Sequence, residues 1–252
     1  MGRDSAAALL PSRMNLIRTE LGIAVATPEP TLIRHIIGVG MNYAAHAAEQ
    51  GKGVPERPML FSKNPFSAGL SGEEIVIPKI CQDRPQVDFE AELGVIVGRH
   101  PSGRLVRDVS KAEALSCVLG YVAGNDVSAR WWQKDGSAGQ FNRGKGFDTF
   151  CPIGPRVLSP KEVGDPQRLR LQCRLNGATM QDSNTSDMIF DVATLIHEIS
   201  RGTTILPGTL IMTGTPSGVG FTRTPPVFLK DGDVVEVEVE RIGTIRNTVR
   251  SE

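Results

Sequence analysis

Two glutamates on one face of an expected strand are the residues whose spacing first suggests chemistry. Glu90 and Glu92 lie in VDFEAELGVIVG, where every second residue from 89 to 97 is apolar. Side chains alternate between the two faces of a strand, so both carboxylates share the other face, which continues with Gly94 and Ile96. Carboxylates facing an apolar enclosure repel each other unless a proton or a cation lies between them, and a hard divalent cation would resolve the repulsion. The alternative is an edge strand whose acidic face lies in water.

A third acid, Asp126, follows a short apolar run in GYVAGNDVSARWWQ (120–133) and precedes the guanidinium of Arg130 and the amide of Gln133. An aspartate in this position can cap a short helix that has Arg130 one turn further on. A capping aspartate at the end of a strand is also well placed to bind an ion, so both interpretations stay open.

Lys145 lies between two glycines in FNRGKGFDTFCPIGP (141–155). Glycine on both sides lets the backbone approach a ligand closely and lets the lysine project inward. The alternative is a loop lysine in solvent, which is the usual environment of this residue type.

His46 and Glu49 are three residues apart in the alanine-rich stretch GMNYAAHAAEQG (40–51). On a helix this spacing puts both side chains on one face, within reach of each other. A carboxylate beside an imidazole orients it and raises its basicity, as a general base requires. The alternative is a His–Glu pair on a surface helix without any role.

The composition of the 252 residues excludes several classes of protein. Lys plus Arg and Asp plus Glu each number 28, so the net charge is zero and no basic surface for nucleic acid is expected. Without a run of 18 apolar residues or a secretory signal, we expect no membrane span and a cytoplasmic location, with mitochondria as the alternative. The chain has no Gly-x-Ser-x-Gly, His-x-x-x-His or Gly-x-Gly-x-x-Gly motif, so a serine hydrolase, a zinc peptidase and a nicotinamide enzyme lack support.

The four cysteines are widely spaced, which favours reduced thiols over a disulfide framework. Cys151, in DTFCPIG, could in principle be a nucleophile. A buried structural thiol is the commoner role of cysteine, and we prefer that interpretation.

Short apolar runs alternate with turns rich in Gly and Pro from Ile36 onward, which favours a strand-rich fold. Helices are expected over 108–118 and 191–202. We treat residues 1–35 as an N-terminal lead-in without clear pattern and 36–252 as one domain. The clearest strands are expected over 93–98, 169–175, 209–214 and 234–240.

The order of these motifs along the chain resembles that of the fumarylacetoacetate hydrolase family, in its short-chain branch. The similarity runs from about Ile36 to Val249 through GVGMNYAAHAAE, VDFEAELGVIVG, GYVAGNDVSARWWQ, GKGFDTFCPIGP, NTSDMIFD and TGTPSGVG. The resemblance implies a strand-rich α+β fold, a mixed and highly twisted β-roll with few short helices, and a homodimer. It also implies one Mg²⁺ or Mn²⁺ ion per chain, held by Glu90, Glu92 and Asp126.

By the same resemblance, the remaining motif residues would act on the substrate. Trp131 stands where relatives commonly carry Asp, and Asn64 follows Lys63 where a Lys-Pro pair is usual. Both departures bear on the identity of the substrate rather than on the metal site. The resemblance implies that the matched positions would bind substrate (Arg130, Gln133 and Thr215) or take part in catalysis (Lys145, and the dyad of His46 and Glu49 on a mobile lid helix).

Together these residues predict a hydrolase that breaks a carbon–carbon bond of a 2,4-dioxo acid. The metal would chelate the 1-carboxylate and 2-oxo oxygen of an acylpyruvate-like substrate and stabilise the enolate, while His46, oriented by Glu49, deprotonates the attacking water. The same enolate serves decarboxylation or keto–enol tautomerisation of oxaloacetate or a larger 2-oxo acid, which is the alternative function. A non-catalytic binding module is a remote further alternative, because no expected ligand is missing.

Overall fold

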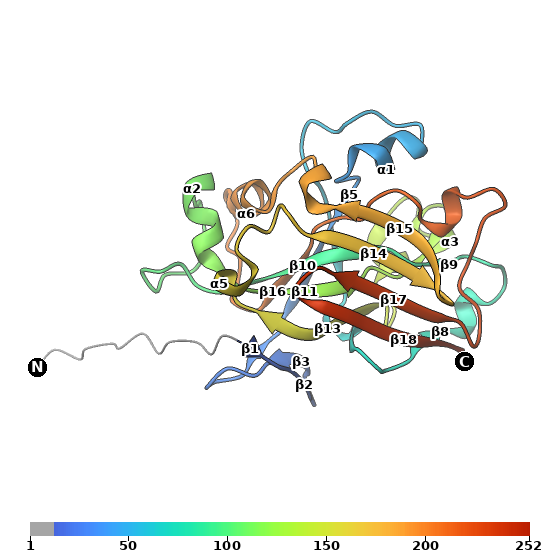
Figure 1. Cartoon of the computed structure of the whole chain (residues 1–252), viewed down its shortest axis with the longest axis horizontal. Coiled ribbons are helices and arrows are strands. Elements are labelled where there is room, and N and C mark those ends of the chain that lie inside the picture. The colour runs from blue at the N-terminus through green and yellow to red at the C-terminus, as the bar shows by residue number, and fades with distance from the viewer. Residues whose placement is uncertain (1–12) are drawn as a thin grey trace, which may run out of the picture.

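Strands make up most of the regular structure in the computed structural model, which describes residues 13–252 (Figure 1). The larger sheet has eight strands, and β7 (Ala68–Leu70) pairs with β13 outside the main path. Along that path the order is β1 (Arg13–Met14), β13 (Cys151–Leu158), β11 (Val118–Asn125), β10 (Ala91–Val97), β16 (Thr209–Met212), β5 (His35–Gly40) and β6 (Met59–Lys63).

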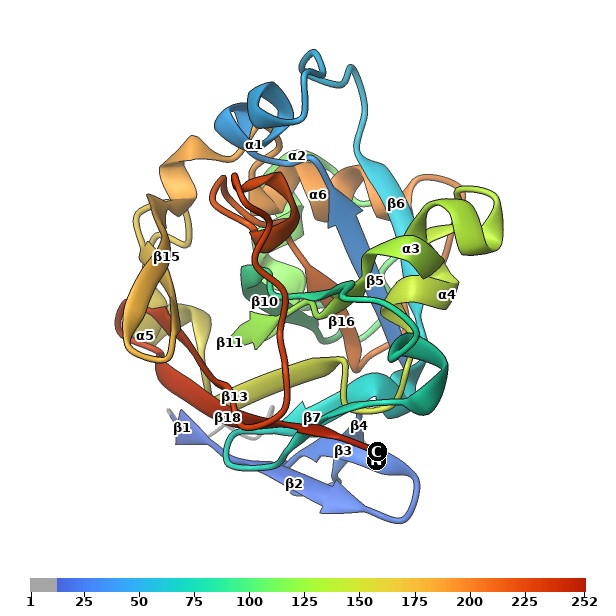
Figure 2. The ribbon, with the colours of Figure 1, turned by 90° about the vertical axis from the view of Figure 1, so that its right-hand side faces the viewer.

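A second sheet of five strands, called the smaller sheet below, packs against the first. Most strand pairs are antiparallel, but β16–β5, β13–β7 and β18–β8 are parallel, so both sheets are mixed. Figure 2 shows the strands curled around β10 and β11, which confirms the predicted strand-rich α+β roll. The order in the second sheet is β15 (Ala178–Asn184), β14 (Arg170–Leu175), β17 (Val234–Val239), β18 (Gly243–Ser251) and β8 (Ile75–Ile77).

Strand β10 is buried along its whole length. Val95 and Val97 belong to the larger apolar cluster of the core, together with residues of β14 and β17. Ile96 packs on the other side, in a smaller cluster with Ile23 and Val122. A strand covered on both faces carries apolar residues at successive positions, which explains the run LGVIV. Charged side chains that enter this region must therefore be paired.

The helices are short. The predicted helix over 191–202 is confirmed as α6, which is capped by Asp191, and the one over 108–118 is reduced to α2 and a single 3₁₀ turn after a capping box of Ser110 and Glu113. Among the described residues no helix has the length and apolar character to cross a membrane. The helices are α1 (Ala44–Glu49), α2 (Lys111–Ala114), α3 (Arg130–Gln133), α4 (Phe141–Lys145), α5 (Pro160–Val163) and α6 (Val192–Ser200), with 3₁₀ turns at 65–67, 79–81, 115–117, 135–137, 185–187 and 220–222.

Strands also form in the described part of the lead-in, where the sequence showed no clear pattern. An antiparallel sheet of β2 (Leu16–Thr19), β3 (Gly22–Val25) and β4 (Thr31–Leu32) buries Ile23 and Ile33 against the larger sheet. These strands are too short for an alternation of apolar residues to be visible in the sequence. Residues 1–12 lie outside the described part, and the domain boundary after residue 35 stays a prediction.

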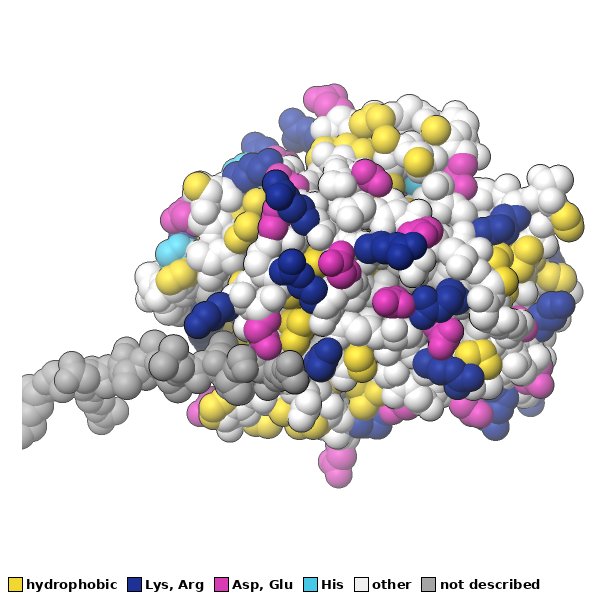
Figure 3. Space-filling view, in the orientation of Figure 1, with side chains coloured by type: hydrophobic (Ala, Val, Ile, Leu, Met, Phe, Trp, Pro, Cys, Tyr) yellow, Lys and Arg dark blue, Asp and Glu magenta, His cyan; other side chains and the backbone are white. Residues whose placement is uncertain are grey.

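The outer face of the smaller sheet carries charges of both signs, as Figure 3 shows. Valines and glutamates alternate along β17 with the valines buried, as the sequence predicted. Arg174 on β14 pairs with Glu236 at 3.3 Å and Glu238 at 2.9 Å. This ladder of ion pairs is a solvated surface, and we assign no chemistry to its glutamates.

Candidate active site

Three buried carboxylates meet where β10 and β11 diverge. Antiparallel pairing sets Ala91 opposite Asn125, so Glu90 and Asp126 are neighbours, and the Asp126 N–H donates to the Glu90 carbonyl at 2.8 Å. One oxygen each of Glu90, Glu92 and Asp126 lies within 4.8 Å of the others, and each residue is at most 5% exposed. The structure thus brings the predicted ligand set together, and no second such group occurs within residues 13–252.

The carboxylates of this cluster are neutralised unequally. Burial and the charges of Asp126 and Glu90 raise the pKa of Glu92 well above its ordinary value, and its carboxylate accepts a hydrogen bond from the Gly214 N–H at 2.8 Å. Burial also raises the pKa of Glu90, but Lys145 and Arg130 outweigh that effect and bring the pKa to about 2. Three oxygen donors, of which Glu92 forms no ion pair within residues 13–252, fit a hard divalent ion such as Mg²⁺ or Mn²⁺. Metal dependence itself stays a prediction.

Lys145 reaches into the carboxylate cluster from the end of α4. Its Nζ pairs with Glu90 Oε2 at 2.7 Å and with Asp126 Oδ2 at 2.5 Å, and the residue is 2% exposed, so the solvated alternative is wrong. A Cβ at Gly144 would lie 2.4 Å from the Gln133 nitrogen. The glycine therefore lets α4 approach α3, rather than letting the backbone approach a ligand.

Arg130 is buried and contacts acceptors on several sides. Its Nη1 lies 2.7 Å from Glu90 Oε1 and donates to Gln133 Oε1 at 3.0 Å. Its Nε and Nη2 donate to Asp88 Oδ2 at 2.9 and 2.7 Å. Burial lowers the pKa of Arg130, but Asp88 and Glu90 outweigh burial and raise the pKa above its ordinary value.

Asp126 is not a helix cap, so that interpretation is wrong. The short strand β12 (Ser128–Ala129) separates it from α3 and pairs with β9 (Val87–Asp88), and Ala129 is the residue that precedes the helix. The Asp126 carboxylate is turned instead toward Lys63 and Lys145. Ion pairing in a buried site leaves this carboxylate unavailable to the backbone N–H groups of α3.

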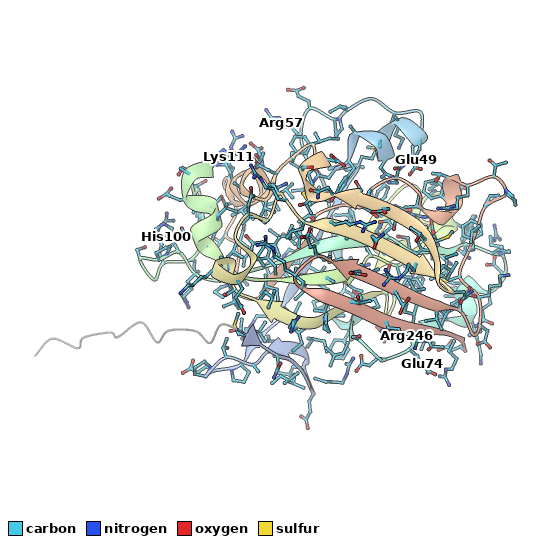
Figure 4. The ribbon with its side chains drawn as sticks, in the orientation of Figure 1. Glu49, Arg57, Glu74, His100, Lys111 and Arg246 are labelled. Atoms are coloured by element: carbon cyan, nitrogen blue, oxygen red, sulfur yellow. The ribbon has the colours of Figure 1, made fainter. Side chains whose placement is uncertain are left out.

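The predicted dyad lies on α1, where a third residue extends it (Figure 4, which labels Glu49). His46 Nδ1 is 2.6 Å from Glu49 Oε1, and His46 Nε2 is 2.8 Å from Gln50 Nε2. Glu49 Oε2 accepts from the Gly218 N–H and the Thr222 hydroxyl, both at 3.1 Å. Burial raises the pKa of Glu49, but hydrogen bonds from His46 and Gly218 outweigh it and hold the pKa below its ordinary value. An ionised Glu49 accepts a hydrogen bond from the Nδ1–H of His46, which leaves Nε2 as the basic nitrogen.

These elements enclose one cavity of about 190 Å³. Thr215 lies in its wall and accepts a hydrogen bond from Gln181 Nε2 at 2.8 Å. Predicted residues in the wall are His46, Glu90, Arg130, Gln133, Lys145 and Thr215, and the other polar and aromatic lining residues include Gln50, Lys52, Lys134, Phe61 and Phe221.

The two departures from the family pattern do not line this cavity. Trp131 packs edge-on against Trp132, with ring centroids 4.8 Å apart, and under the Arg84 guanidinium at 4.5 Å. Asn64 caps a 3₁₀ turn by accepting from the Phe66 N–H at 3.1 Å. Their effect on substrate choice is therefore at most indirect.

Sequence analysis missed Asp88, Lys63 and Gln50. Asp88 extends the alternation of Glu90 and Glu92 by one step, so the same pattern could have revealed it. Gln50 follows α1 as its C-cap, next to the dyad, and carries no signal of its own.

Lys63 entered the sequence analysis only as the residue before Asn64, and the resemblance at that position was the one signal that could have revealed it. No role was assigned to it, because it lies on the edge strand β6 and its partners are distant in sequence. Its Nζ is fully buried, pairs with Asp126 Oδ1 and donates to the Phe150 carbonyl at 3.0 Å. Asp126 is thus held between two lysines, and its position in the cluster is fixed from both sides.

Comparisons with known proteins identify the family to which the chain belongs. The family described as fumarylacetoacetate (FAA) hydrolase C-terminal matches residues 35–250. The chain is 44% identical over 216 residues to "Oxaloacetate tautomerase FAHD2A, mitochondrial" from Bos taurus, an alignment that covers 85% of the chain and 66% of the bovine protein. It is 45% identical over 218 residues to "2,4-didehydro-3-deoxy-L-rhamnonate hydrolase" from Sphingomonas sp. (strain SKA58), covering 86% of the chain and 73% of that protein. The chain therefore spans just under two thirds of the length of the bovine relative.

The solved structure of 5-carboxymethyl-2-hydroxymuconate delta-isomerase from Mycobacterium smegmatis shares the fold. It superimposes with a TM-score of 0.77 at 35% identity and covers 95% of this chain and 99% of that one. The homodimer and the cytoplasmic location stay predictions, and the name of the bovine relative places that protein in mitochondria, which is the alternative location. From the match over residues 35–250 and the similarity to these enzymes, the chain belongs to the fumarylacetoacetate hydrolase family.

Proposed function

We propose that this enzyme interconverts the keto and enol forms of a small 2-oxo dicarboxylic acid of the oxaloacetate type. The lining of the cavity carries the proposal: an imidazole oriented by a carboxylate shares the wall with four cations, Lys52, Arg130, Lys134 and Lys145. Arg130 and Lys145 are already paired with buried carboxylates, whereas Lys52 and Lys134 form no ion pair within residues 13–252, and these two lysines suit a substrate with a second carboxylate. The similarity to a protein named oxaloacetate tautomerase supports the same substrate class.

His46 is the residue suited to move the proton. With Nδ1 donating to Glu49, its Nε2 can take a proton from carbon 3 and return it to the oxygen on carbon 2. Glu49 stabilises the imidazolium that exists between the two transfers. Gln50, which contacts Nε2 in the free enzyme, must give way to the substrate.

The buried cations stabilise the negative charge that develops on the oxygen at carbon 2 of the substrate. Lys145 and Arg130 border the cavity and supply fixed positive charge that needs no reorganisation during the reaction. Arg130 and Gln133 are suited to hold the planar 1-carboxylate. A divalent cation held by Glu90, Glu92 and Asp126 would add Lewis-acid stabilisation of the same oxygen.

The second carboxylate is assigned to Lys52 and Lys134. Burial is the main cause that lowers the pKa of Lys134, and the nearby charges of Arg130 and Lys52 add to it, so three cations are close together on this side of the cavity. An ion pair that stabilises the 4-carboxylate in the bound substrate opposes its departure as CO₂, because departure removes its charge. Tautomerisation leaves that carboxylate intact, so the geometry favours it over decarboxylation.

Hydrolysis of a 2,4-dioxo acid is the second candidate. The His46–Glu49 dyad can equally activate a water for attack on a 4-carbonyl, and one relative is named as a hydrolase. Acetylpyruvate cleavage and oxaloacetate tautomerisation, each measured with Mg²⁺, separate the two functions. Release of pyruvate from acetylpyruvate that outpaces tautomerisation would favour the hydrolase.

The test of the proposed function compares two histidine variants. His46→Ala should slow enol–keto relaxation of oxaloacetate, followed by the ultraviolet absorbance of the enol, by roughly 10²–10⁴-fold. His100→Ala is the matched control, because His100 lies 3.5 Å from Glu113 in a His–Glu pair on the opposite side of the molecule from Glu49 (Figure 4). Equal rates for both variants would show that α1 carries no catalytic base.

A further inference from the structure

Asp88 is a fully buried carboxylate that does not line the cavity but contacts two residues that do, Arg130 and Phe221. It lies two residues before Glu90 in the same alternating pattern, yet it is not part of the three-carboxylate cluster. Its residue exposure is 0%, and its Oδ2 accepts from Arg130 Nε at 2.9 Å and Nη2 at 2.7 Å. Charge-assisted bonds of this kind hold a guanidinium in one plane and orientation.

The same carboxylate also fixes the loop that carries Phe221. Asp88 accepts from the Gly220 N–H at 2.8 Å and the Phe221 N–H at 3.1 Å. A Cβ at Gly220 would lie 1.8 Å from the Val227 carbonyl oxygen and 2.5 Å from Asp88 Oδ1, so glycine is required where this loop meets both groups. The Phe221 ring lines the cavity and stacks on the Arg130 guanidinium at 4.4 Å.

Asp88 therefore determines the orientation of the Arg130 guanidinium relative to the cavity. With Nε and Nη2 turned to Asp88, Nη1 faces Glu90 and Gln133, which both line the cavity. The Phe221 ring covers one face of the guanidinium, so a carboxylate would approach Arg130 in the guanidinium plane, at the edge beside Glu90 and Gln133.

We infer that Asp88 is a positioning residue, which holds Arg130 and Phe221 in the arrangement that receives the substrate carboxylate. The inference rests on the proposed function only in requiring a carboxylate ligand. Asp88 acts through Arg130, so its loss should weaken binding of the anion far more than it slows proton transfer at His46.

The test measures anion binding separately from turnover. Oxalate, a dianion that resembles the 1-carboxylate and 2-oxygen of a 2-oxo acid, is titrated calorimetrically into the Mg²⁺-supplemented enzyme. Asp88→Asn keeps the shape of the side chain and removes its charge, and should raise the oxalate Kd and the KM for oxaloacetate by roughly 10–100-fold. The value of kcat should change much less.

Asp182→Asn is the matched control. Asp182 makes the same kind of contact with Arg170 (2.9 and 2.6 Å), but on the exposed face of the smaller sheet. Its substitution should leave Kd and KM unchanged. An Asp88→Asn variant that loses stability but binds oxalate like the wild type would overturn the inference and leave Asp88 a purely structural residue.

A double variant covers the case in which Asp88→Asn does not fold. Asp88→Asn combined with Arg130→Gln removes both charges of the buried pair, which proteins tolerate better than removal of one. Its oxalate Kd should match that of Arg130→Gln within about twofold, because the two residues act as one unit. A further 10–100-fold weakening would overturn the inference, as would a wild type that binds no oxalate. Oxalate binding without oxaloacetate turnover would refute the proposed function and leave this inference standing.

Discussion

Replacing Lys63 by methionine tests whether the buried charges are arranged as the structure indicates. Lys63 is the last residue of β6. Its Nζ pairs with Asp126 and donates to the Phe150 carbonyl at 3.0 Å. Methionine has a similar length and no charge, so the variant keeps the packing and removes one cation. Asp126 would then depend on Lys145 alone, and the Phe150 carbonyl would lose this donor.

The expected loss of stability is large because both partners are buried. Side-chain exposure is 0% for Lys63 and for Asp126, so water does not replace the lost partner. Removing one member of such a pair costs about 3–5 kcal/mol. For a domain of this size that corresponds to a fall in Tm of roughly 6–20 °C.

The assay is urea unfolding followed by circular dichroism, with a constant m-value as the sign that only stability has changed. Thermal melts with and without Mg²⁺ complete it. In the variant, four buried acids face two cations, so a divalent ion should restore more stability than it adds to the wild type.

The control is Lys111→Met. Lys111 Nζ lies 3.0 Å from Asp191 Oδ2 with 56% of its side chain exposed, and Figure 4 shows it at the surface. An exposed pair of this kind contributes about 0–1 kcal/mol. If Lys63→Met were no more destabilised than this control, the buried pair and the charge balance of the cluster would be refuted.

Two further predictions concern the chemistry of the site. Exhaustive chelation should abolish turnover and lower Tm, and Mg²⁺ or Mn²⁺ should restore both, because Glu90, Glu92 and Asp126 form a hard oxygen site; full activity in the chelated enzyme would contradict this. Cys151→Ala should keep most of its turnover at a cost of about 1 kcal/mol in stability, because burial raises the pKa of the thiol to about 12 and prevents it from acting as a thiolate; a trapped thioester on Cys151 in the wild type would show the opposite.

The sequence alone predicted the features that depend on short-range periodicity. Glu90 and Glu92 alternate with apolar residues, and the structure places both beside Asp126. His46 and Glu49 are separated by three residues, and the structure joins them at 2.6 Å. Alternation and helical spacing are properties of the local backbone, so they can be recognised without knowledge of the fold.

Interpretations based on local sequence were wrong where a contact with a neighbouring element decided the role of a residue. The glycines beside Lys145 were expected to let the backbone approach a ligand, but Lys145 ends α4, and Gly144 serves the contact of α4 with α3. Asp126 had the sequence context of a cap, but two lysines compete for its carboxylate. In both cases a residue distant in sequence supplies the deciding contact.

Only the tertiary structure revealed what neutralises the buried acids. Lys63 comes from β6, Lys145 from α4 and Arg130 from α3, and none of these cations is close in sequence to Glu90. Their charges are energetically acceptable in the core because the fold brings them to within ion-pair distance of the carboxylates. Pairing of buried charges depends on distance in space, whereas a sequence records only distance along the chain.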